Sequence, residues 1–518
     1  MLPLTDPGPS PASIGALRAI PTLTSVRILL DECVLCHRLN CGSGMKLKLS
    51  ALILTFAVTS FAQSTTRLSN EDRSVEIRID QVVKEYMSAY KIPGISLAVL
   101  RGGKIVLLKS YGLANVEHQV PVKPETIFQS GSIGKQFTAA AIMILVQDGK
   151  ISLDDKISKY IADVPPGWKD ITVRHLLNHT SGLGDYPAEI DLRRDYTEDE
   201  FLDSFKKAPL DFVPGSKWNY SNVGYVTLGI LIRKVTGKYY GDFLQERIFQ
   251  PLDMRTARII SEADIVPNRA AGYRLVRGEL KNQEWVSPST NSTADGSLYL
   301  SILDLAKWDA ALYTVSPLTQ ASRNAIWTSA RLNDGTSKGY GFGWHIANLH
   351  GHRIVLHGGA WQGFKSQIIR FLDSEVSIIF LANSWETRDF KLARALAATV
   401  YPEFALPDVR VAQDAEPQVT SLVRRALIQI TTDTLDERLF APQSRAAFDG
   451  NKRKEIQEKL NALSLPVAVI QSSEFVDRRS ENNLRVYRYL LTDLGGSLLC
   501  TLALTPEDKI SSLDVSSL

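Results

Sequence analysis

The chain has 518 residues, of which 44% are hydrophobic and 22% charged, and its 59 Lys and Arg residues exceed its 56 Asp and Glu residues by three. This length predicts two globular domains, and the composition is that of a soluble folded protein, which excludes disorder as the general state. A net charge of only +3, without a long basic run, lacks the electrostatic footprint of a nucleic-acid-binding protein. We therefore expect no nucleic-acid partner.

The N-terminal region is predicted to be a targeting sequence. A basic stretch at 45–48 precedes an apolar run over 49–61, and Ser60 and Ala62 supply small residues, as in a cleaved signal peptide at 45–62. An apolar run of about 13 residues is shorter than the roughly 20 that a membrane-spanning helix needs. We therefore expect a periplasmic or secreted protein, with no stable membrane span after cleavage.

Residues 1–44 form an extension that we expect to be untranslated or unstructured, since signal peptides stand at the start of a chain. Our hypothesis is that translation starts at Met45, and detecting peptides from 1–44 would contradict it. The extension contains Cys-Val-Leu-Cys-His at 33–37, the pattern of c-type haem attachment. Because this motif precedes the predicted cleavage site, we expect no cofactor, and Cys500 remains as a buried free thiol.

Apolar periodicity predicts the elements of a large domain at 70–401. A helix is expected at 70–91, a β-hairpin at 94–112, a helix at 132–148, strands at 353–359, 364–372 and 376–383, and a helix at 391–401. A sheet is thus built from both ends of this region, with mainly helical sequence between them. This pattern predicts a mixed α/β fold, an antiparallel sheet flanked by helices together with an all-helical region.

A linker is expected at 402–417, where Pro, Asp and Ala follow one another with little periodicity. The remaining residues, 418–518, are predicted to form a small α+β accessory domain. Its expected helices lie at 422–430 and 453–463, and its expected strands at 467–471, 484–491 and 497–504. No catalytic constellation is found in it.

The first chemical motif is Ser132-Ile-Gly-Lys135, which opens an Ala-rich helix. A spacing of three places the hydroxyl and the amine about one turn apart on the same face. A lysine can take the proton of a serine when desolvation lowers its pKa, and the helix N-terminus adds partial positive charge beside the serine. By itself the pattern is equally typical of a helix cap with a surface lysine.

Two further motifs follow along the chain. Tyr220-Ser221-Asn222 carries a phenol that can shuttle a proton and an amide that can hold a substrate. His357-Gly358-Gly359 ends a predicted strand, where glycines let a substrate approach the backbone and an N–H group can stabilise an oxyanion. Taken alone, the first is also typical of a surface loop and the second of a turn.

The three motifs in this order, with 220 − 132 = 88 residues between Ser132 and Tyr220, resemble those of the serine β-lactamase and penicillin-binding-protein superfamily. The similarity is to the branch of class C β-lactamases, D-alanyl-D-alanine carboxypeptidases, D-aminopeptidases and esterases. Stretches at 128–131, 175–183 and 301–308 are also similar, and the resemblance covers roughly 70–400. It implies a β-lactamase/transpeptidase-like fold and a serine hydrolase that acts through an acyl-enzyme on Ser132.

The resemblance also implies roles for individual residues. Lys135 and Tyr220 would share general acid/base work, Asn222 would orient the substrate, and the backbone N–H groups of Ser132 and Ala360 would form the oxyanion hole. The substrate would be a small-molecule or peptide acyl compound. A β-lactam, a D-alanyl peptide and an ester all remain open, as does the oligomeric state.

His357, beside Gly358 and Gly359, stands where many β-lactamases have Lys. A lysine suits a substrate carboxylate, whereas a histidine is only partly charged near neutral pH. This difference favours an ester or peptide substrate without that carboxylate.

Other classes of protein fit less well. An α/β-hydrolase needs Gly-x-Ser-x-Gly, which the residues around Ser132 do not supply. His350-x-His352 lacks a third metal ligand, and His175 and His179 lack the Glu of a His-Glu-x-x-His motif, so we expect no metal and regard these histidines as structural. The remaining alternative is a non-catalytic peptidoglycan or peptide sensor with the same fold.

Overall fold

A computed structural model describes residues 70–517 apart from 260–262, 350, 401, 403–410, 446–447, 449, 462–465 and 494–495. The expected signal peptide at 45–62, the 1–44 extension with its haem-like motif, His350 and most of the first half of the expected linker lie outside the described residues. No helix within the described part of the chain is both long and apolar enough to cross a membrane.

A seven-stranded antiparallel sheet in the order β3-β2-β1-β12-β11-β10-β9 forms the centre of the large domain. Its strands are β1 (Gly94–Arg101), β2 (Lys104–Asn115), β3 (Val120–Pro121), β9 (His345–Leu349), β10 (His352–Trp361), β11 (Phe364–Phe371) and β12 (Val376–Ala382). The register from Ile95↔Ala382 to Arg101↔Val376 joins the two ends of the domain. The prediction of an antiparallel sheet made from both ends is therefore confirmed.

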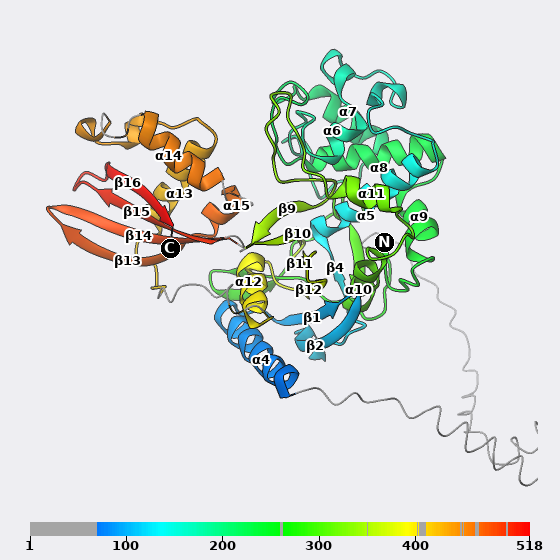
Figure 1. Ribbon diagram of the computed structural model, residues 1–518, viewed down its shortest axis with the longest axis horizontal. Coiled ribbons are helices and arrows are strands. Elements are labelled where there is room, and N and C mark those ends of the chain that lie inside the picture. Colours follow the sequence, from blue (N-terminus) through cyan, green and yellow to red (C-terminus); the bar gives the residue numbers. More distant parts are fainter. Residues whose placement is uncertain are drawn as a thin grey trace, which may run out of the picture. The chain divides into compact units, whose positions relative to one another are not determined.

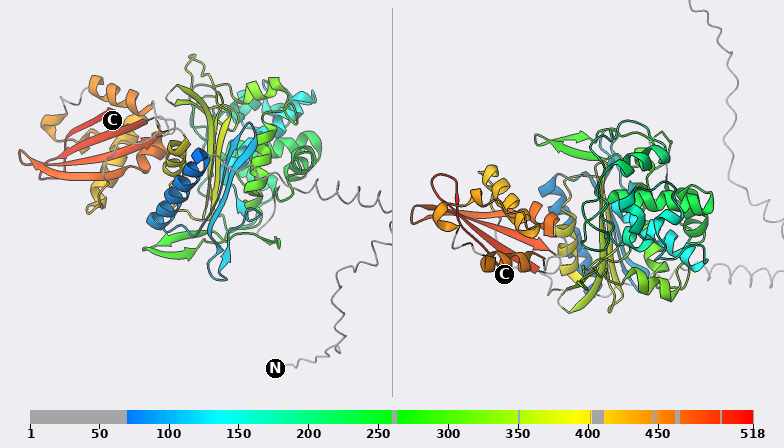
Figure 2. Two further views of the ribbon diagram at one scale, coloured as in Figure 1. Left: turned by 60° about the horizontal axis from the view of Figure 1, so that its bottom comes forward. Right: turned by 90° about the horizontal axis from the view of Figure 1, so that it is seen from above.

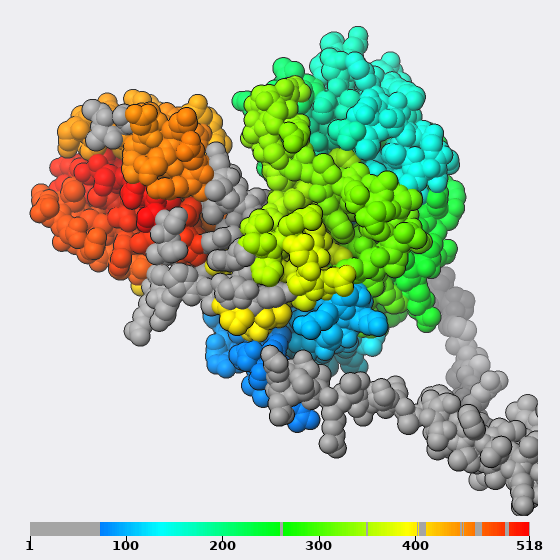
Figure 3. Space-filling model, in the orientation of Figure 1, coloured from blue at the N-terminus to red at the C-terminus, as the bar shows by residue number. Residues whose placement is uncertain are grey.

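The sheet separates two hydrophobic cores because successive side chains of a strand point to opposite faces. Ile95, Leu97 and Val99 belong to one core, and Ala98 and Leu100 to the other. The helices α4 (Asn70–Tyr90) and α12 (Asp389–Val400) lie side by side over the first face (Figure 1). The space-filling view shows the blue surface of the N-terminal segment beside the yellow surface of the α12 region (Figure 3).

The opposite face of the sheet is covered by a mainly helical region, so that the sheet lies between two layers of helices (Figure 2). The helices of this region are α5 (Gly134–Gln147), α6 (Val173–Leu177), α7 (Glu198–Lys207), α8 (Asn222–Thr236), α9 (Tyr240–Leu244), α10 (Ile302–Ala311) and α11 (Gln320–Ile326). Helix α5 has buried side chains from Gly134 to Leu145. Its Ala-rich, almost uncharged sequence is what a central helix surrounded by others requires.

Two small sheets complete the large domain. In the order β4-β8-β5, strand β4 (Ile127–Gln129) pairs with β8 (Leu298–Ser301), which also pairs with β5 (Arg258–Ile259). A hairpin of β6 (Tyr273–Val276) and β7 (Glu279–Asn282) forms the other. Because β4 ends three residues before Ser132, its pairing with β8 fixes the chain that leads into the nucleophile turn.

Within the described ranges, the C-terminal residues form a four-stranded antiparallel meander with three α-helices and a hydrophobic core of their own. The strands are β13 (Glu474–Glu481), β14 (Leu484–Asp493), β15 (Gly496–Leu504) and β16 (Ile510–Ser517), and the helices are α13 (Pro417–Thr431), α14 (Gly450–Asn461) and α15 (Pro466–Gln471). Cys500 is a buried free thiol in this core. The edge strands β13 and β16 are not predicted from the sequence because they alternate weakly and contain many polar residues.

The predicted strand at 467–471 is wrong, since these residues belong to helix α15. A run of four or five apolar residues fits either a strand or a buried turn of helix, and periodicity cannot separate the two. Pro466 is the first residue of the helix, a position at which its fixed φ and missing N–H favour helix formation.

Candidate active site

The three sequence motifs converge on one cleft of about 380 Å³, which includes Ser132, Asn222 and Ala360 in its lining. Ser132 lies in a short 3-10 turn, Gly131–Ile133, that leads directly into α5. Tyr220 lies in the loop before α8, and Asn222 is the first residue of that helix. His357 to Ala360 belong to β10. All the candidate residues from the sequence thus come from elements that meet at this cleft.

Lys135 lies beneath the cleft, and its ammonium group is fully engaged. Its Nζ donates to Ser132 Oγ at 3.1 Å, to Asn222 Oδ1 at 2.7 Å and to the carbonyl oxygen of Asp295 at 2.5 Å. An ammonium has three N–H donors, so all three are used. The amide and carbonyl oxygens can only accept, whereas the serine can also donate. When Lys135 is neutral, its lone pair is therefore directed to Ser132.

Burial lowers the pKa of Lys135 to about 8, although the carboxylates of Asp295 and Asp185 act in the opposite direction. The side chain is completely buried, and desolvation disfavours its charged form. A substantial fraction of Lys135 is therefore a neutral amine at mildly alkaline pH. The structure gives the amine both the position and the protonation state that a general base needs.

Tyr220 packs against Lys135 on one side and against His179 on another. The Lys135 Nζ lies 4.9 Å from the centre of its ring. Burial raises the pKa of Tyr220 well above its usual range, and a hydrogen bond with Ser132 offsets only part of this effect. The phenol is therefore protonated at neutral pH and suited to donate a proton rather than to accept one.

Asn222 holds the base in place. Its Oδ1 accepts from Lys135, and its Nδ2 donates to the two carboxylate oxygens of Asp185 at 3.1 and 3.3 Å. Asp185 thereby fixes which end of the amide faces Lys135. The predicted role of Asn222 toward a substrate stays a prediction, and its contacts in the structure are with the machinery itself.

The nucleophile turn is pressed against the backbone of β10. Pairing of β10 with β9 ends at Leu356↔His345, so on that side Gly358 to Trp361 run beside the turn, while on the other side they stay paired with β11. A Cβ on Gly131, which has φ +54°, would lie 2.4 Å from the amide nitrogen of Ala360. The predicted oxyanion-hole donors, the N–H groups of Ser132 and Ala360, thus come from two segments in direct contact.

Gly359 is required by this contact, and we expect Gly359→Ala to destabilise the fold. The added Cβ would lie 1.9 Å from the carbonyl oxygen of Ser130 and 2.3 Å from Ser366 Oγ. A backbone atom cannot yield without moving the nucleophile turn, so a loss of about 3 kcal/mol is expected in urea unfolding. Gly450→Ala is the control because a Cβ there meets nothing. Equal midpoints for the two variants would contradict the close approach.

His357 carries no charge in this site, which corrects the expectation of a partly charged side chain. Burial lowers its pKa to about 3. Its Nδ1 lies 2.6 Å from the carbonyl oxygen of Gly358 and must donate to it, so Nε2 accepts from the Tyr340 hydroxyl at 3.0 Å. His357, held by the carbonyl oxygen of Gly358, therefore provides no cation for a substrate carboxylate.

His179 is more closely tied to the site than its sequence pattern indicates. Its Nδ1 accepts from the backbone N–H of Ser221 at 3.1 Å, and its carbonyl oxygen accepts from the N–H of Asn219 at 3.0 Å. Its ring packs on that of Tyr220, with centroids 4.2 Å apart. Both neighbours of Tyr220 are thus fastened to one buried histidine. By contrast, His175 serves the N-terminal cap of α6, as expected for a structural histidine.

The acidic residues Asp185 and Asp295 are functional candidates that sequence reasoning missed. Both line the cleft, and they are the only charged side chains among its described lining residues. Tyr186 donates to Asp295 Oδ2 at 3.3 Å. Each aspartate stands alone in the sequence, without a motif that would mark it, and reaches Lys135 only through the fold.

We expect Asp295→Asn to shift the pH dependence of turnover toward lower pH. The rate rises as Lys135 loses its proton, and the negative charge of Asp295 raises the pKa of Lys135. Removing that charge lowers this pKa, so the midpoint of the rise in kcat/KM moves down. Asp203→Asn, at an exposed carboxylate with 70% exposure, is the control. An unchanged or higher midpoint would exclude electrostatic control by Asp295.

No group of three or more histidine, cysteine or acidic side chains arranged for a metal ion occurs among residues that the structure describes. The cleft itself brings together an alcohol, a buried amine, a phenol and an amide.

Comparison with known proteins identifies the family. The Beta-lactamase family matches residues 79–401, which is more than half of the chain, and the chain belongs to this family. It is 32% identical over 315 residues to Penicillin-binding protein 4* of Bacillus subtilis, covering 57% of this chain and 69% of that protein. It is 30% identical over 316 residues to a D-aminopeptidase of Brucella anthropi, covering 59% of each.

Solved structures agree with this assignment. A penicillin-binding protein from Bacillus halodurans has a TM-score of 0.55 and 26% identity, covering 62% of this chain and 98% of that one. The octameric penicillin-binding protein homologue from Pyrococcus abyssi, at a TM-score of 0.58 and 24% identity, covers 85% of this chain and 95% of its own. The expected β-lactamase/transpeptidase-like fold is confirmed, and the protein is a serine hydrolase of that fold. The chain spans less than two thirds of the D-aminopeptidases' length.

Proposed function

We propose that this protein is an exported hydrolase that cleaves amide bonds through an acyl-enzyme on Ser132, with a preference for acyl groups that carry a free ammonium. The observation that carries the acyl-enzyme step is the hydrogen bonding of Lys135. Two of its three partners can only accept, so its lone pair, when it is neutral, is directed to Ser132 Oγ.

In this mechanism Lys135 takes the proton of Ser132 while Oγ forms a bond to the carbonyl carbon of the substrate. The carbonyl oxygen becomes an oxyanion that accepts hydrogen bonds from the N–H groups of Ser132 and Ala360. Tyr220 donates its phenolic proton to the leaving nitrogen as the carbon–nitrogen bond breaks, and Lys135 returns a proton to the phenolate. Water then hydrolyses the ester to Ser132 by the same groups in reverse.

The preference for an ammonium follows from the charges of the cleft. Asp185 is an exposed carboxylate in its lining, Asp295 is a second acidic side chain, and His357 is neutral. A substrate carboxylate would meet the exposed carboxylate of Asp185 and no available cation, whereas an ammonium would meet opposite charge; burial raises the pKa of Asp295, so Asp185 carries most of this preference. Relatives named D-aminopeptidase support a substrate of this kind. A β-lactam or a peptide that presents its carboxylate to the cleft is disfavoured.

The test compares D-alanine p-nitroanilide, its N-acetyl derivative and nitrocefin under identical conditions. We expect kcat/KM for the free amine to exceed that for the acetylated compound by at least about tenfold, or about 1.4 kcal/mol. An adduct whose mass equals the acyl group should accumulate on Ser132 under rapid quench. Turnover of nitrocefin above that of the amine would overturn the substrate preference. No adduct and no turnover with any compound would favour the non-catalytic sensor.

Export is proposed from the basic and apolar stretch at 45–62 and is tested separately. We expect the mature protein, recovered from the periplasm or medium of the native host, to begin near Gln63. An N-terminus upstream of this stretch on the functional protein would contradict export by cleavage there.

We expect Tyr220→Phe to separate leaving groups by their need for a proton. Acylation by an amide, followed as kcat/KM, should slow by about 10²–10³-fold, because the leaving nitrogen must be protonated. For a p-nitrophenyl ester of the same acyl group, kcat/KM should fall less than about tenfold, since p-nitrophenolate leaves without a proton. Equal losses for both substrates would show that Tyr220 acts on the nucleophile or on the fold instead.

A further inference from the structure

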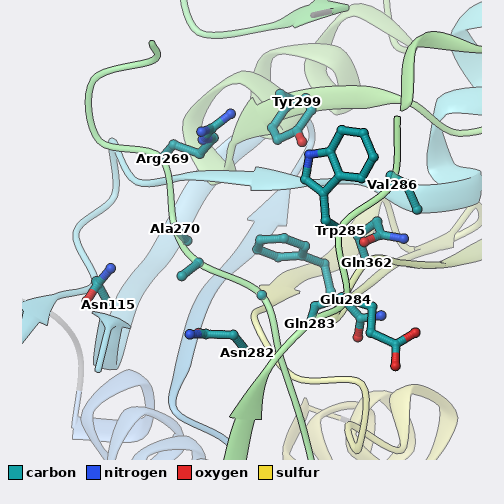
Figure 4. Close-up of a pocket in the computed structure, with 13 residues that line it drawn as sticks. Asn115, Arg269, Ala270, Asn282, Gln283, Glu284, Trp285, Val286, Tyr299 and Gln362 are labelled. Carbon is teal, nitrogen blue, oxygen red and sulfur yellow. The ribbon is translucent and has the colours of Figure 1, made fainter. Parts of the chain in front are cut away.

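A second cavity, of about 370 Å³, lies beside the active-site cleft. Tyr299 and the alanines at 270 and 271 contribute to its lining, together with Phe364 and the segment 282–286. Figure 4 shows Asn115 on one side of this cavity and Trp285 with Gln362 on the other. The segment 282–286 is fastened by the N–H of Gln283, which donates to the carbonyl oxygen of Gly272 at 3.0 Å.

The wall between the two cavities is a short hydrogen-bonded chain. Trp361 lines the active-site cleft, and its indole N–H donates to Asn291 Oδ1 at 2.7 Å. The other end of the same amide, Nδ2, donates to the Tyr299 hydroxyl at 3.0 Å. The chain continues from Trp361 to Gln362, which lines the second cavity. Asn291 therefore bridges Trp361, which lines the active-site cleft, and Tyr299, which lines the second cavity. A molecule in the second cavity lies on the other side of this bridge from the cleft of Ser132.

The polar lining of the second cavity consists mainly of uncharged amides, and Arg269 and Glu284 are its charged side chains within the described ranges. The side-chain amides of Gln283 and Gln362 make no hydrogen bond to any residue in the described ranges, and Asn115 uses only its oxygen, for the N–H of His118 at 2.8 Å. An amide offers two donors and an acceptor on one rigid plane. Glu284 is already paired with Arg274. Amides that both donate and accept, and that are themselves uncharged, match the hydroxyls of a neutral ligand.

The aromatic lining adds a second requirement on that ligand. Trp285 is 56% exposed, and its indole makes no hydrogen bond within the described part of the chain. The face of an aromatic ring carries partial negative charge and attracts the weakly positive C–H groups of a saturated ring. The exposed indole and the amides of Gln283 and Gln362 thus offer an apolar face and hydrogen-bonding groups to the same ligand.

We propose that this second cavity binds a neutral pyranose ring, with one face of the sugar on Trp285 and its hydroxyls bonded to Asn115, Gln283 and Gln362. The volume is in the range of small-ligand sites. The ring can be part of the substrate of Ser132 or of a separate polysaccharide, and the chemistry of recognition is the same. This site does not depend on the reaction at Ser132.

Binding is tested by saturation-transfer difference NMR with the methyl β-glycosides of glucose, galactose and N-acetylglucosamine on the full chain. We expect transfer to at least one sugar in the wild type, a Kd raised at least tenfold by Trp285→Ala, and a smaller rise for Trp285→Phe, which keeps an aromatic face. Trp385→Ala is the matched control, since Trp385 is 47% exposed and does not line the cavity. It should bind as the wild type does.

Gln283→Ala keeps the proposal testable if the tryptophan variants do not fold, and it should weaken binding at least fivefold. Absence of transfer to all three sugars, or equal binding by wild type and Trp285→Ala, would overturn the sugar site.

Two amide substrates that differ by one pyranose then show whether the bound ring belongs to the substrate or to a separate polysaccharide. A lower KM for the glycosylated substrate, lost in Trp285→Ala, assigns the ring to the substrate. Equal KM values with free-sugar binding assign it to a separate polysaccharide.

Discussion

Replacing Ser132 with alanine is expected to lower kcat by about 10⁵-fold or more while leaving the protein folded. The side chain is half-buried in the turn just before α5, and its hydroxyl accepts a hydrogen bond from Lys135. Without Oγ no acyl-enzyme can form, so the remaining rate is that of binding and oxyanion stabilisation alone. The adduct on the protein, followed by mass, should disappear with the turnover.

Two controls separate chemistry from folding for this variant. The midpoint of thermal unfolding should change by less than about 2 °C, because deletion of one partly exposed hydroxyl is a small perturbation. Ser480→Ala, at an exposed position of β13, should keep wild-type turnover. If Ser132→Ala retained more than a hundredth of the wild-type rate, another group would have to be the nucleophile.

The parts of the site that could be predicted from the sequence are those fixed by local geometry. Ser132 and Lys135 meet because a helical spacing of three brings them together. The strands around His357 could be predicted because buried strands are continuous apolar runs with glycine at the close approach to Ser130. The three motifs identified the candidate residues and their order along the chain. The resemblance to the serine β-lactamase and penicillin-binding-protein superfamily indicated the role of each residue.

The contacts that the sequence could not supply are those between distant segments. Lys135 donates to the carbonyl oxygen of Asp295, 160 residues away, and Asp185 reaches Lys135 only through Asn222. No pattern marks a single aspartate or a single backbone oxygen. The same limit applies to His179, which lies 41 positions before Tyr220 and packs its ring on that side chain. No sequence motif connects these two residues. Because the charge of the cleft comes from such isolated residues, the preferred substrate could not be predicted without the fold.

Replacing Lys135 with methionine is expected to lower kcat/KM by about 10⁴-fold, the upper range for loss of a general base. Methionine nearly matches the buried volume but has no lone pair that can take a proton. The wild-type profile should rise with pH through a midpoint near 8, where Lys135 becomes neutral, and the residual activity of the variant should lack this rise. Lys104→Met, at an exposed position of β2, is the control and should behave as the wild type.

The Lys135→Met variant also loses the donors to Asn222 Oδ1 and to the carbonyl oxygen of Asp295, which costs about 1–3 kcal/mol for each buried acceptor left unpaired. A lower rate could therefore follow from a displaced Asn222 as well as from the missing base.

Chemical rescue distinguishes these two causes of a lower rate. In Lys135→Ala the removed chain leaves a buried cavity beside Ser132, and propylamine is small enough to enter it and supply a neutral amine. We expect the rate of this variant to rise with the concentration of the unprotonated amine and not with that of propanol. Equal effects of the two additives, or none, would mean that Lys135 holds the site together without taking the proton.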